Sequence, residues 1–324
     1  MGAIEPGLAA FEPACPSADS FASESPGPEF AGFRDEPPQM RSGAVGKRGA
    51  LTLGFERRGD RTILADLASR TPCLASRALH CDAAMPDMPW VFMITSTGCV
   101  LQGDRLHTEV SLKAGARAHV TTQSATKVHA MDANYGLMTQ SIVLEEGSYL
   151  EFVPDPLLLH RDARFASRTR ITIAPGATLL YSEIVQPGRK HHSADESLAV
   201  TLMSLELQAS RPDGRLIMSE RLVLDPHEVA PRQTGVMDGF DIFANVLLLT
   251  PKASAERVAA RVPAGVDFDR GLAHGACSLP NEAGLIYKAL GRETAVVKEA
   301  VRAFWGIARE EAAGASITPP FLSR

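Results

Sequence analysis

The sequence predicts a mainly β protein with layered, stacked β-sheets built from repeated hairpins, a small α+β lobe near the C-terminus and a long final helix. Three observations support this fold class. Short alternating apolar runs bounded by Gly, Pro and Asp fill the middle of the chain, and no helix-length periodic stretch interrupts them. A strand–turn–strand unit recurs there about every 30 residues. After residue 237 the pattern changes to strands mixed with helices.

The first 45 residues precede this pattern and predict a disordered tail. They hold seven acidic and two basic residues, and the resulting charge of −5 equals the net charge of the whole 324-residue chain. They also hold seven of the 22 prolines. Such an acidic, Pro- and Ser-rich segment buries too little apolar surface to offset its ordering entropy. Glu5, Pro6 and Glu12 interrupt the apolar stretch that a signal peptide needs.

Residues 46–237 are predicted to form the layered β body. Within it, three segments share a strand, a turn with Gly and a second strand. The three glycines, Gly115, Gly147 and Gly176, are 32 and 29 residues apart. Each turn is expected to need Gly at positive φ, as in a tight hairpin. The expected strands are residues 106–112, 118–122, 140–144, 149–153, 170–173 and 178–184.

Residues 238–324 are predicted to form the α+β lobe, packed on the body. Strands are expected at residues 243–249, 272–279 and 284–290, and a short helix at residues 253–262. The segment 293–311 predicts a long helix with a broad apolar face. Phe304 and Trp305 on that face fit either the core or a contact surface, and we favour the core.

Composition excludes several classes of protein. The chain has 33 basic and 38 acidic residues, so no basic nucleic-acid footprint is expected. Its longest apolar run falls far short of the roughly 20 residues of a membrane span. The five cysteines are odd in number and form no Cys-x-x-Cys pair, which suits reduced thiols. We therefore expect a cytoplasmic protein.

Common enzyme motifs for phosphate, dinucleotide, zinc or serine-hydrolase chemistry are absent, apart from one S-x-x-K. Ser124 and Lys127 form it, and in a hydrolase such a lysine activates the serine. That pattern belongs at the start of a helix, whereas here it follows an expected strand. A hydrolase is therefore only a remote reading.

Two short segments contain side chains that bind borderline metal ions such as Ni²⁺ or Zn²⁺. His80 and Cys81 begin a Pro-containing loop that also holds two aspartates and two methionines. His191 and His192 are adjacent, and on an extended strand adjacent side chains point to opposite faces. We weigh both as weak metal candidates against ordinary polar loops, and we favour the polar loops.

Three carboxylates stand in apolar surroundings. Asp104 follows an apolar run, and Glu183 and Glu220 lie inside apolar strands. Alternation places Glu183 on the same face as Leu179 and Tyr181. A carboxylate buried there without a partner costs several kcal/mol. The residues alone leave a functional role and a structural ion pair equally open.

Five segments carry a family resemblance. They are residues 97–106 (TGCVLQGDRL), 121–128 (TTQSATKV), 151–156 (EFVPDP), 177–189 (ATLLYSEIVQPGR) and 290–294 (LGRET) with the helix that follows. In this order and spacing they resemble the UreD family of urease accessory proteins, also called UreH. The likeness forms one unit over residues 46–322. Cys99 and Gln102 replace two glycines of the family's first signature, which puts its turn geometry in question, and His160 stands where an aromatic residue is common.

The resemblance implies a non-enzymatic scaffold and metallochaperone. UreD-like proteins bind the urease apoprotein subunits and, with UreF and the GTPase UreG, deliver Ni²⁺ to the urease active site. Their fold is a layered β structure with few helices. An internal polar passage is proposed as the nickel route, and its positions map by motif onto Asp104, Thr126, Glu183 and Glu220.

We therefore expect Asp104, Glu183 and Glu220 to be transient nickel ligands or to set the electric field of the passage. Thr126 and Lys127 are expected to line or support it, and no cofactor is expected to bind tightly. Spaced carboxylates suit a carrier because a closed Cys/His cage would trap the ion. The alternative is a pure docking protein, in which the carboxylates only satisfy buried arginines and no nickel enters the chain.

Overall fold

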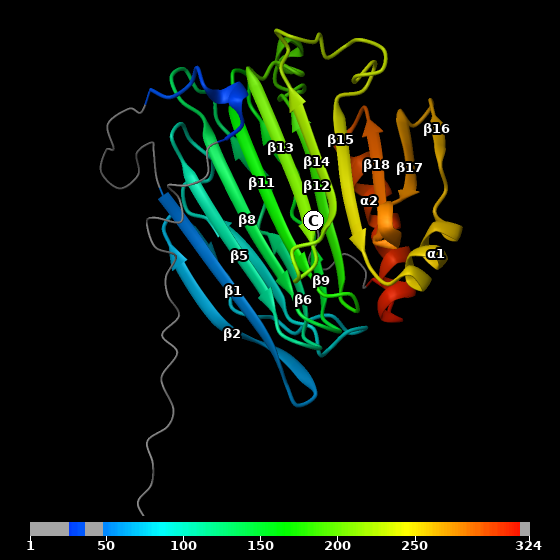
Figure 1. The fold of residues 1–324 in the computed structure, drawn as a ribbon. Coiled ribbons are helices and arrows are strands. Elements are labelled where there is room, and N and C mark those ends of the chain that lie inside the picture. The colour runs from blue at the N-terminus through cyan, green and yellow to red at the C-terminus, as the bar shows by residue number, and fades with distance from the viewer. Residues whose placement is uncertain (1–25, 36–47, 318–324) are drawn as a thin grey trace, which may run out of the picture.

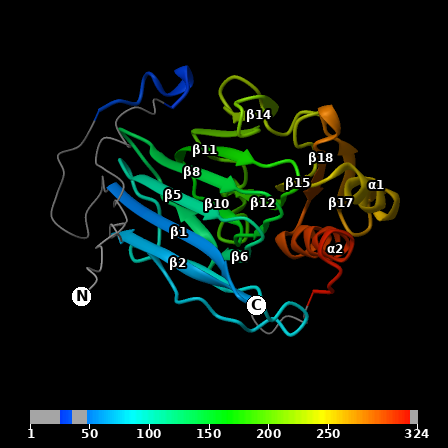
Figure 2. The ribbon, with the colours of Figure 1, turned by 60° about the horizontal axis from the view of Figure 1, so that its bottom comes forward.

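The computed structural model describes residues 26–35 and 48–317. Two sheets dominate this part of the chain, with seven strands in the first and eleven in the second. Figure 1 shows the strands of the first sheet side by side, and Figure 2 shows both helices near β17 and β18. The expected mainly β, layered fold with a long C-terminal helix is confirmed.

The first sheet has the strand order β14-β13-β11-β8-β5-β1-β2. In chain order its strands are β1 (Arg48–Arg58), β2 (Arg61–Arg70), β5 (Arg105–Leu112), β8 (Gly136–Leu144), β11 (Arg164–Ile173), β13 (Leu202–Ser210) and β14 (Leu216–Leu224).

The second sheet has the order β16-β17-β18-β15-β12-β9-β6-β4-β3; the short strand β10 also pairs with β12, and β7 pairs with β10. In chain order its strands are β3 (Cys73–Ala75), β4 (Trp90–Thr95), β6 (Arg117–Thr122), β7 (Thr126–Val128), β9 (Tyr149–Phe152), β10 (Leu157–Leu159), β12 (Thr178–Pro187), β15 (Ile242–Leu249), β16 (Gly265–Asp267), β17 (Leu272–Ser278) and β18 (Gly284–Gly291).

The repeated units are not hairpins, which corrects the expectation from the sequence. The two strands of each unit do not pair with each other: β5, β8 and β11 pair side by side in the first sheet, and β6, β9 and β12 do so in the second. Each turn therefore carries the chain from one sheet to the other. Because every pass crosses in the same sense, neighbouring strands within these triplets are parallel.

The glycine turns stack on one another where the chain crosses. Gly115 and Gly147 both have φ 67°, as expected, and the Gly115 N–H donates to the Glu146 carbonyl over 3.0 Å. Gly176 differs, since its φ is not positive. Its N–H instead donates to the Glu146 carboxylate over 3.3 Å, in a space where a Cβ would lie 1.8 Å from Oε1. The only atoms this close belong to the carboxylate of the exposed Glu146 side chain, which can move aside, so neither backbone freedom nor close approach requires glycine at position 176.

The largest apolar core lies between the two sheets. Phe165 contributes from the first sheet, and Phe152 and Leu179 contribute from the second. Leu180, the next residue of β12, instead joins a core on the opposite face, under the C-terminal helix. This alternation follows from the strand period of two residues.

The C-terminal strands extend the second sheet, because β15 pairs antiparallel with β12. The boundary expected between the β body and the α+β lobe, at residue 237, therefore lies just before β15, a strand of one continuous sheet that runs through both parts. The helices α1 (Lys252–Arg261) and α2 (Thr294–Ala313) pack on this extension. Phe304 and Trp305 are buried there, which confirms their assignment to the core. No helix in the described ranges is long and apolar enough to cross a membrane.

Residues 26–35 form a strap on the outer face of the first sheet. The predicted disorder of residues 1–45 does not extend to them, and the other residues of that segment lie outside the described ranges. Within the strap, Pro28–Phe30 form a 3-10 turn, and Glu29 forms an ion pair with Arg221 of β14. Phe30, 1% exposed, packs on a small cluster made of Tyr135, Leu137, Ala166 and Leu202. The burial of Phe30 and the ion pair of Glu29 help to offset the ordering entropy of this segment, which its composition alone had suggested would keep it disordered.

We expect Phe30→Ala to lower the free energy of unfolding by about 2–3 kcal/mol, as measured by urea denaturation. The substitution removes a buried aromatic ring, but the strap can detach, which keeps the loss below that of a central core Phe. Phe268→Ala is the matched control, since Phe268 is 74% exposed and its loss should stay within about 0.5 kcal/mol. Equal stabilities of the two variants would show that the strap does not contribute to the fold.

Candidate functional site

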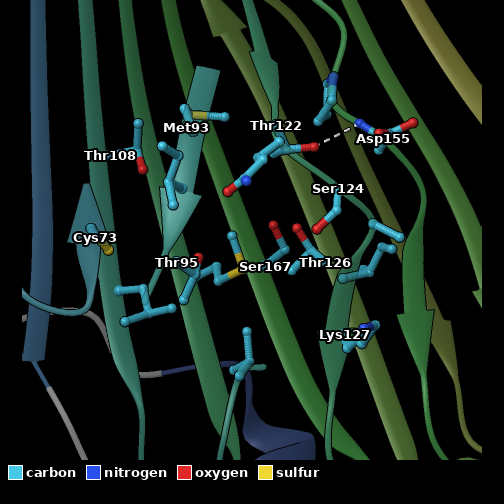
Figure 3. Close-up of a pocket in the computed structure, with 18 of the residues that line it drawn as sticks. Cys73, Met93, Thr95, Thr108, Thr122, Ser124, Thr126, Lys127, Asp155 and Ser167 are labelled. Carbon is cyan, nitrogen blue, oxygen red and sulfur yellow. Dashed lines mark hydrogen bonds between the residues drawn. The ribbon is translucent and has the colours of Figure 1, made fainter. Parts of the chain in front are cut away.

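A cavity of about 140 Å³ lies between the two sheets. Its walls combine apolar side chains with hydroxyl groups, and Figure 3 shows those of Ser124, Thr126 and Ser167 gathered within it. Thr122 holds one wall in place, because its Oγ1 accepts the Asp155 backbone N–H over 2.9 Å. The lining is mainly apolar, and the hydroxyl groups among it supply hydrogen-bond partners for water.

A second cavity, of about 410 Å³, lies beside the edge strand β14 of the first sheet. The first sheet ends at β14 while the second continues through β15, β18 and β17, so the two sheets part here. Apolar side chains such as Leu207, Leu222 and Phe243 form most of its lining, together with the polar Glu220, Asn245 and Lys288.

Glu183 of β12 borders both cavities. The strand pairs with β9 up to Tyr181 and with β10 from Val185 onward, so Glu183 lies where its neighbouring strand changes. Tyr181 Oη donates to Glu183 Oε1 over 2.8 Å and lies 3.0 Å from Thr169 Oγ1. Leu179 and Tyr181 belong to the core between the sheets, so the face predicted for Glu183 is confirmed.

The Glu183 carboxyl lies in an environment that disfavours its charge. Burial, together with the nearby Glu220 carboxylate, raises its pKa to about 7, although the Tyr181 hydrogen bond acts in the opposite direction. The side chain keeps some accessible surface because it faces the cavities. Near neutral pH the group therefore exchanges readily between its neutral and charged forms.

Glu220 lines the second cavity with protein partners already in place. Asn245 Nδ2 donates to its Oε2 over 2.7 Å, and Lys288 forms an ion pair with it. Asn245 is also the residue opposite Glu183 in the β12–β15 register. The structure thus brings Glu183 and Glu220 together around one cavity, two residues that are distant in the sequence.

Asp104 lies elsewhere, and within the described residues it is not part of the lining of either cavity. It is fully buried in the turn before β5, where its Oδ2 accepts the Leu101 N–H over 2.8 Å. The burial of Cys73 and, to a smaller extent, the nearby negative charge of Asp104 raise the pKa of the Cys73 thiol to about 12. The contacts of Asp104 fit a residue that fixes this turn.

The turn that contains Asp104 tolerates the two missing glycines of the family signature. Positive φ occurs at the retained Gly98 and Gly103, with values of 71° and 79°. Gln102 adds a contact that glycine lacks, since its Oε1 accepts three consecutive backbone N–H groups. These belong to Asp132, Ala133 and Asn134, at 2.8, 2.8 and 3.2 Å.

Thr126 and Lys127 of β7 both contribute to the wall of the first cavity, as their proposed supporting role requires. Lys127 is exposed, and no ion pair joins it to an acid within the described residues. Ser124 lies in the turn between β6 and β7 and not at the start of a helix. The S-x-x-K motif therefore lacks the setting of a serine hydrolase.

The weak metal candidates do not converge on a common point. His80 Nε2 lies 2.9 Å from the Thr62 carbonyl oxygen, and the exposed Cys81 has a raised thiol pKa because of partial burial and Asp82. His191 and His192 face different carboxylates, those of Glu293 and Glu196 respectively. Across residues 26–35 and 48–317, no group of three or more His, Cys, Asp or Glu side chains could hold a metal ion.

One buried ionic cluster escaped the sequence analysis. Arg309 of α2 is fully buried, and its guanidinium forms a two-pronged pair with Glu151 of β9, at 2.7 and 2.6 Å. The same guanidinium reaches Asp82 Oδ2 at 2.5 Å. His119 Nδ1 and Tyr149 Oη complete the cluster, lying 2.8 and 2.7 Å from the Glu151 oxygens.

This cluster ties the C-terminal helix to the second sheet and to the loop before β4. Burial pushes the Glu151 pKa upward, but hydrogen bonds from Arg309 and His119 outweigh it and lower the pKa to about 2. Burial also lowers the pKa of His119, whose ring stacks on Trp90 with centroids 3.7 Å apart. The one sequence signal for this cluster was the position of Arg309, which the helical period places on the buried apolar face of α2.

Comparison with known proteins gives a consistent result. A family model described as UreD urease accessory protein matches residues 47–324. A protein named urease accessory protein UreD from Photorhabdus laumondii is 48% identical over 311 residues, covering 96% of this chain and 96% of the relative. Another from Yersinia pseudotuberculosis is 51% identical over 297 residues, covering 92% of each. Urease accessory protein UreD 2 from Brucella suis is 43% identical over 294 residues, covering 91% of this chain and 97% of the relative.

We expect Arg309→Ala to destabilise the fold by about 3–5 kcal/mol at pH 7, because it leaves two buried carboxylates uncompensated. Arg270→Ala on the surface pair with Glu299 is the control and should cost less than about 1 kcal/mol. Because the Glu151 pKa is depressed, the stabilisation is complete above about pH 4.5 and is lost as pH falls toward 2. The gap between wild type and Arg309→Ala, measured by denaturation, should therefore shrink over that window; a constant gap would refute the assignment.

Glu183→Gln should raise the free energy of unfolding above pH 7. The raised folded-state pKa means that wild type loses stability as pH rises from about 4.5 to about 7, because the folded carboxyl resists ionisation. The gain in the variant is at most about 3 kcal/mol, and less where water in the cavities screens the charge. Denaturation at several pH values measures it, with Glu56→Gln on the outer face as control. A gain that does not vanish below pH 4.5 would contradict this account.

Proposed function

Because the chain belongs to the UreD family of urease accessory proteins, we propose that it acts as a non-enzymatic scaffold and metallochaperone in urease maturation. In this proposal it binds the urease apoprotein subunits and, with UreF and the GTPase UreG, helps to deliver Ni²⁺ to the urease active site. The proposal locates this work in the cytoplasm, which the free thiols of the four described cysteines support.

The observation that carries the proposal is the position of Glu183 between two interior cavities. One cavity has hydroxyl groups among its apolar walls, and the other is lined in part by Glu220. An ion that travels between the sheets would meet oxygen ligands at intervals and never a closed cage. Such spaced ligands bind Ni²⁺ weakly enough to release it. Water in the cavities lowers the cost of burying the carboxylates.

The protonation of Glu183 fits a transient ligand. A carboxyl group must lose its proton to bind a metal ion, so each binding event releases a proton. With a pKa of about 7, Glu183 gives up this proton at little cost near neutral pH. Without a metal ion the group is partly protonated near neutral pH, and an arriving cation stabilises its charged form. The Tyr181 hydroxyl, 2.8 Å away, orients the carboxylate in both states.

A docking protein without a metal passage is the alternative, and specific contacts favour it for two of the three acids. Asp104 is occupied by a backbone N–H, and Glu220 by Lys288 and Asn245. In the metal proposal, Lys288 must release Glu220 when nickel arrives. Glu183 has no cationic partner among the described residues, so it separates the two readings most sharply.

Co-expression with apo-urease subunits, UreF and UreG tests the proposal. We expect Glu183→Gln and the double variant with Glu220→Gln to assemble the complex normally but to lower urease nickel content and activity at limiting Ni²⁺, by about tenfold for the double variant. This corresponds to about 1.4 kcal/mol of lost ligand stabilisation. Nickel per urease is measured by atomic absorption, and Glu56→Gln, a carboxylate change on the outer face, is the control.

Three other outcomes would decide against parts of the proposal. Full activation by the double variant would remove the passage and leave the docking role. Failure of the wild-type chain to bind any of these partners would remove the maturation role itself. Loss of complex formation in Glu183→Gln alone would assign this carboxylate to docking.

A further inference from the structure

Two histidines face each other at the surface where two short parallel strands end. His129 follows β7 and His160 follows β10, and Val128 pairs with Leu159 in the register between these strands. The His160 N–H donates to the Val128 carbonyl over 2.9 Å, which keeps the two chains together one residue further. The two rings have centroids 5.4 Å apart and an interplanar angle of 50°.

This ring separation matches two imidazoles that share one metal ion. A metal about 2.1 Å from a ring nitrogen lies about 3.2 Å from that ring's centre. Two rings at tetrahedral or octahedral angles around it are then roughly 4.5–5.5 Å apart. Stacked rings could not both point a nitrogen at one ion, whereas rings inclined by 50° can. The ring separation and tilt are therefore compatible with one ion shared by the two imidazoles.

The surroundings of His160 favour its neutral imidazole, which is the form that binds metals. Burial, then the Arg189 and His129 charges, lowers the pKa of His160, while Glu196 acts in the opposite direction. His129 Nδ1 lies 3.4 Å from the Ala130 carbonyl, which leaves Nε2 as its ligand atom. Glu196 pairs with Arg189 and offsets part of that positive charge. Lys127 adds a positive charge nearby, so binding there should be weak and reversible.

We propose that His129 and His160 form a surface site for one divalent ion of the borderline class, Ni²⁺ or Zn²⁺, with its remaining positions filled by water or a partner's side chain. Imidazole is a ligand suited to such ions, and two ligands leave an open coordination sphere. The site adjoins the first cavity, whose wall includes Thr126 and Lys127 of the same strand β7. An ion released here would therefore be beside that cavity.

The site stands on its two imidazoles and does not require the proposed function. It differs in chemistry and place from the carboxylates between the sheets. Its failure and the failure of the nickel passage are therefore separable by experiment.

Calorimetric titration of the full-length, tag-free chain with NiCl₂ and ZnCl₂ tests the site. We expect His160→Phe, which keeps ring volume, and His129→Gln each to remove one bound equivalent or to weaken it at least tenfold. The double substitution His191→Gln with His192→Gln is the control, since those exposed histidines face separate carboxylates. The variant with Glu183→Gln and Glu220→Gln should retain the equivalent.

Unchanged stoichiometry and affinity in both His129→Gln and His160→Phe would overturn the proposal, and so would equal loss in the control. A second measurement on wild type does not depend on how the variants fold. Cu²⁺ bound at one equivalent should show electron paramagnetic resonance couplings from two imidazole nitrogens. Couplings from one nitrogen or none would also overturn it.

Discussion

The crossing of the chain between two sheets is the constraint on which the rest of the structure depends. Three strands of the first sheet, β5, β8 and β11, each run through a tight turn into the next strand of the second sheet, as at Gly115 and Gly147. Successive passes then stack in parallel within each layer, and one face of each sheet looks onto a shared core. Any polar residue on an inward position must find its partners inside that core.

The cavities follow from this geometry. Where inward positions carry Thr108, Ser167 and other small hydroxyl side chains, the sheets leave unfilled space between them. The first sheet stops at β14 while the second continues, which opens the second cavity. Glu183 lies between the two spaces because β12 exchanges β9 for β10 at that point. A carboxylate placed there is neither firmly paired nor fully solvated, which explains both its raised pKa and its suitability for transient chemistry.

The opposite face of the second sheet, under α2, contains buried charged groups. There the chain buries full charges, but it pairs them closely: Arg309 meets Glu151 and Asp82, and His119 and Tyr149 take up the remaining carboxylate positions. The cluster fixes α2 in one position against the sheet. The charged groups under α2 are therefore closely paired, whereas the Glu183 carboxyl between the sheets has no cationic partner among the described residues. This contrast separates a structural ionic group from a candidate functional one more clearly than burial does.

The sequence by itself determined the strand-rich layered fold, most strand positions in the repeat, the final helix with its buried face, and the inward side of Glu183. These features depend on local periodicity, which a single chain displays directly. Only the tertiary structure decided that the repeat units cross between sheets, because turn residues alone do not state which strands pair. It also separated Asp104 from Glu183 and Glu220, and it brought Arg309 to Glu151 and His129 to His160. Contacts between residues distant in sequence depend on how the two sheets and the helix stack. Local sequence patterns do not show which distant residues this stacking brings together.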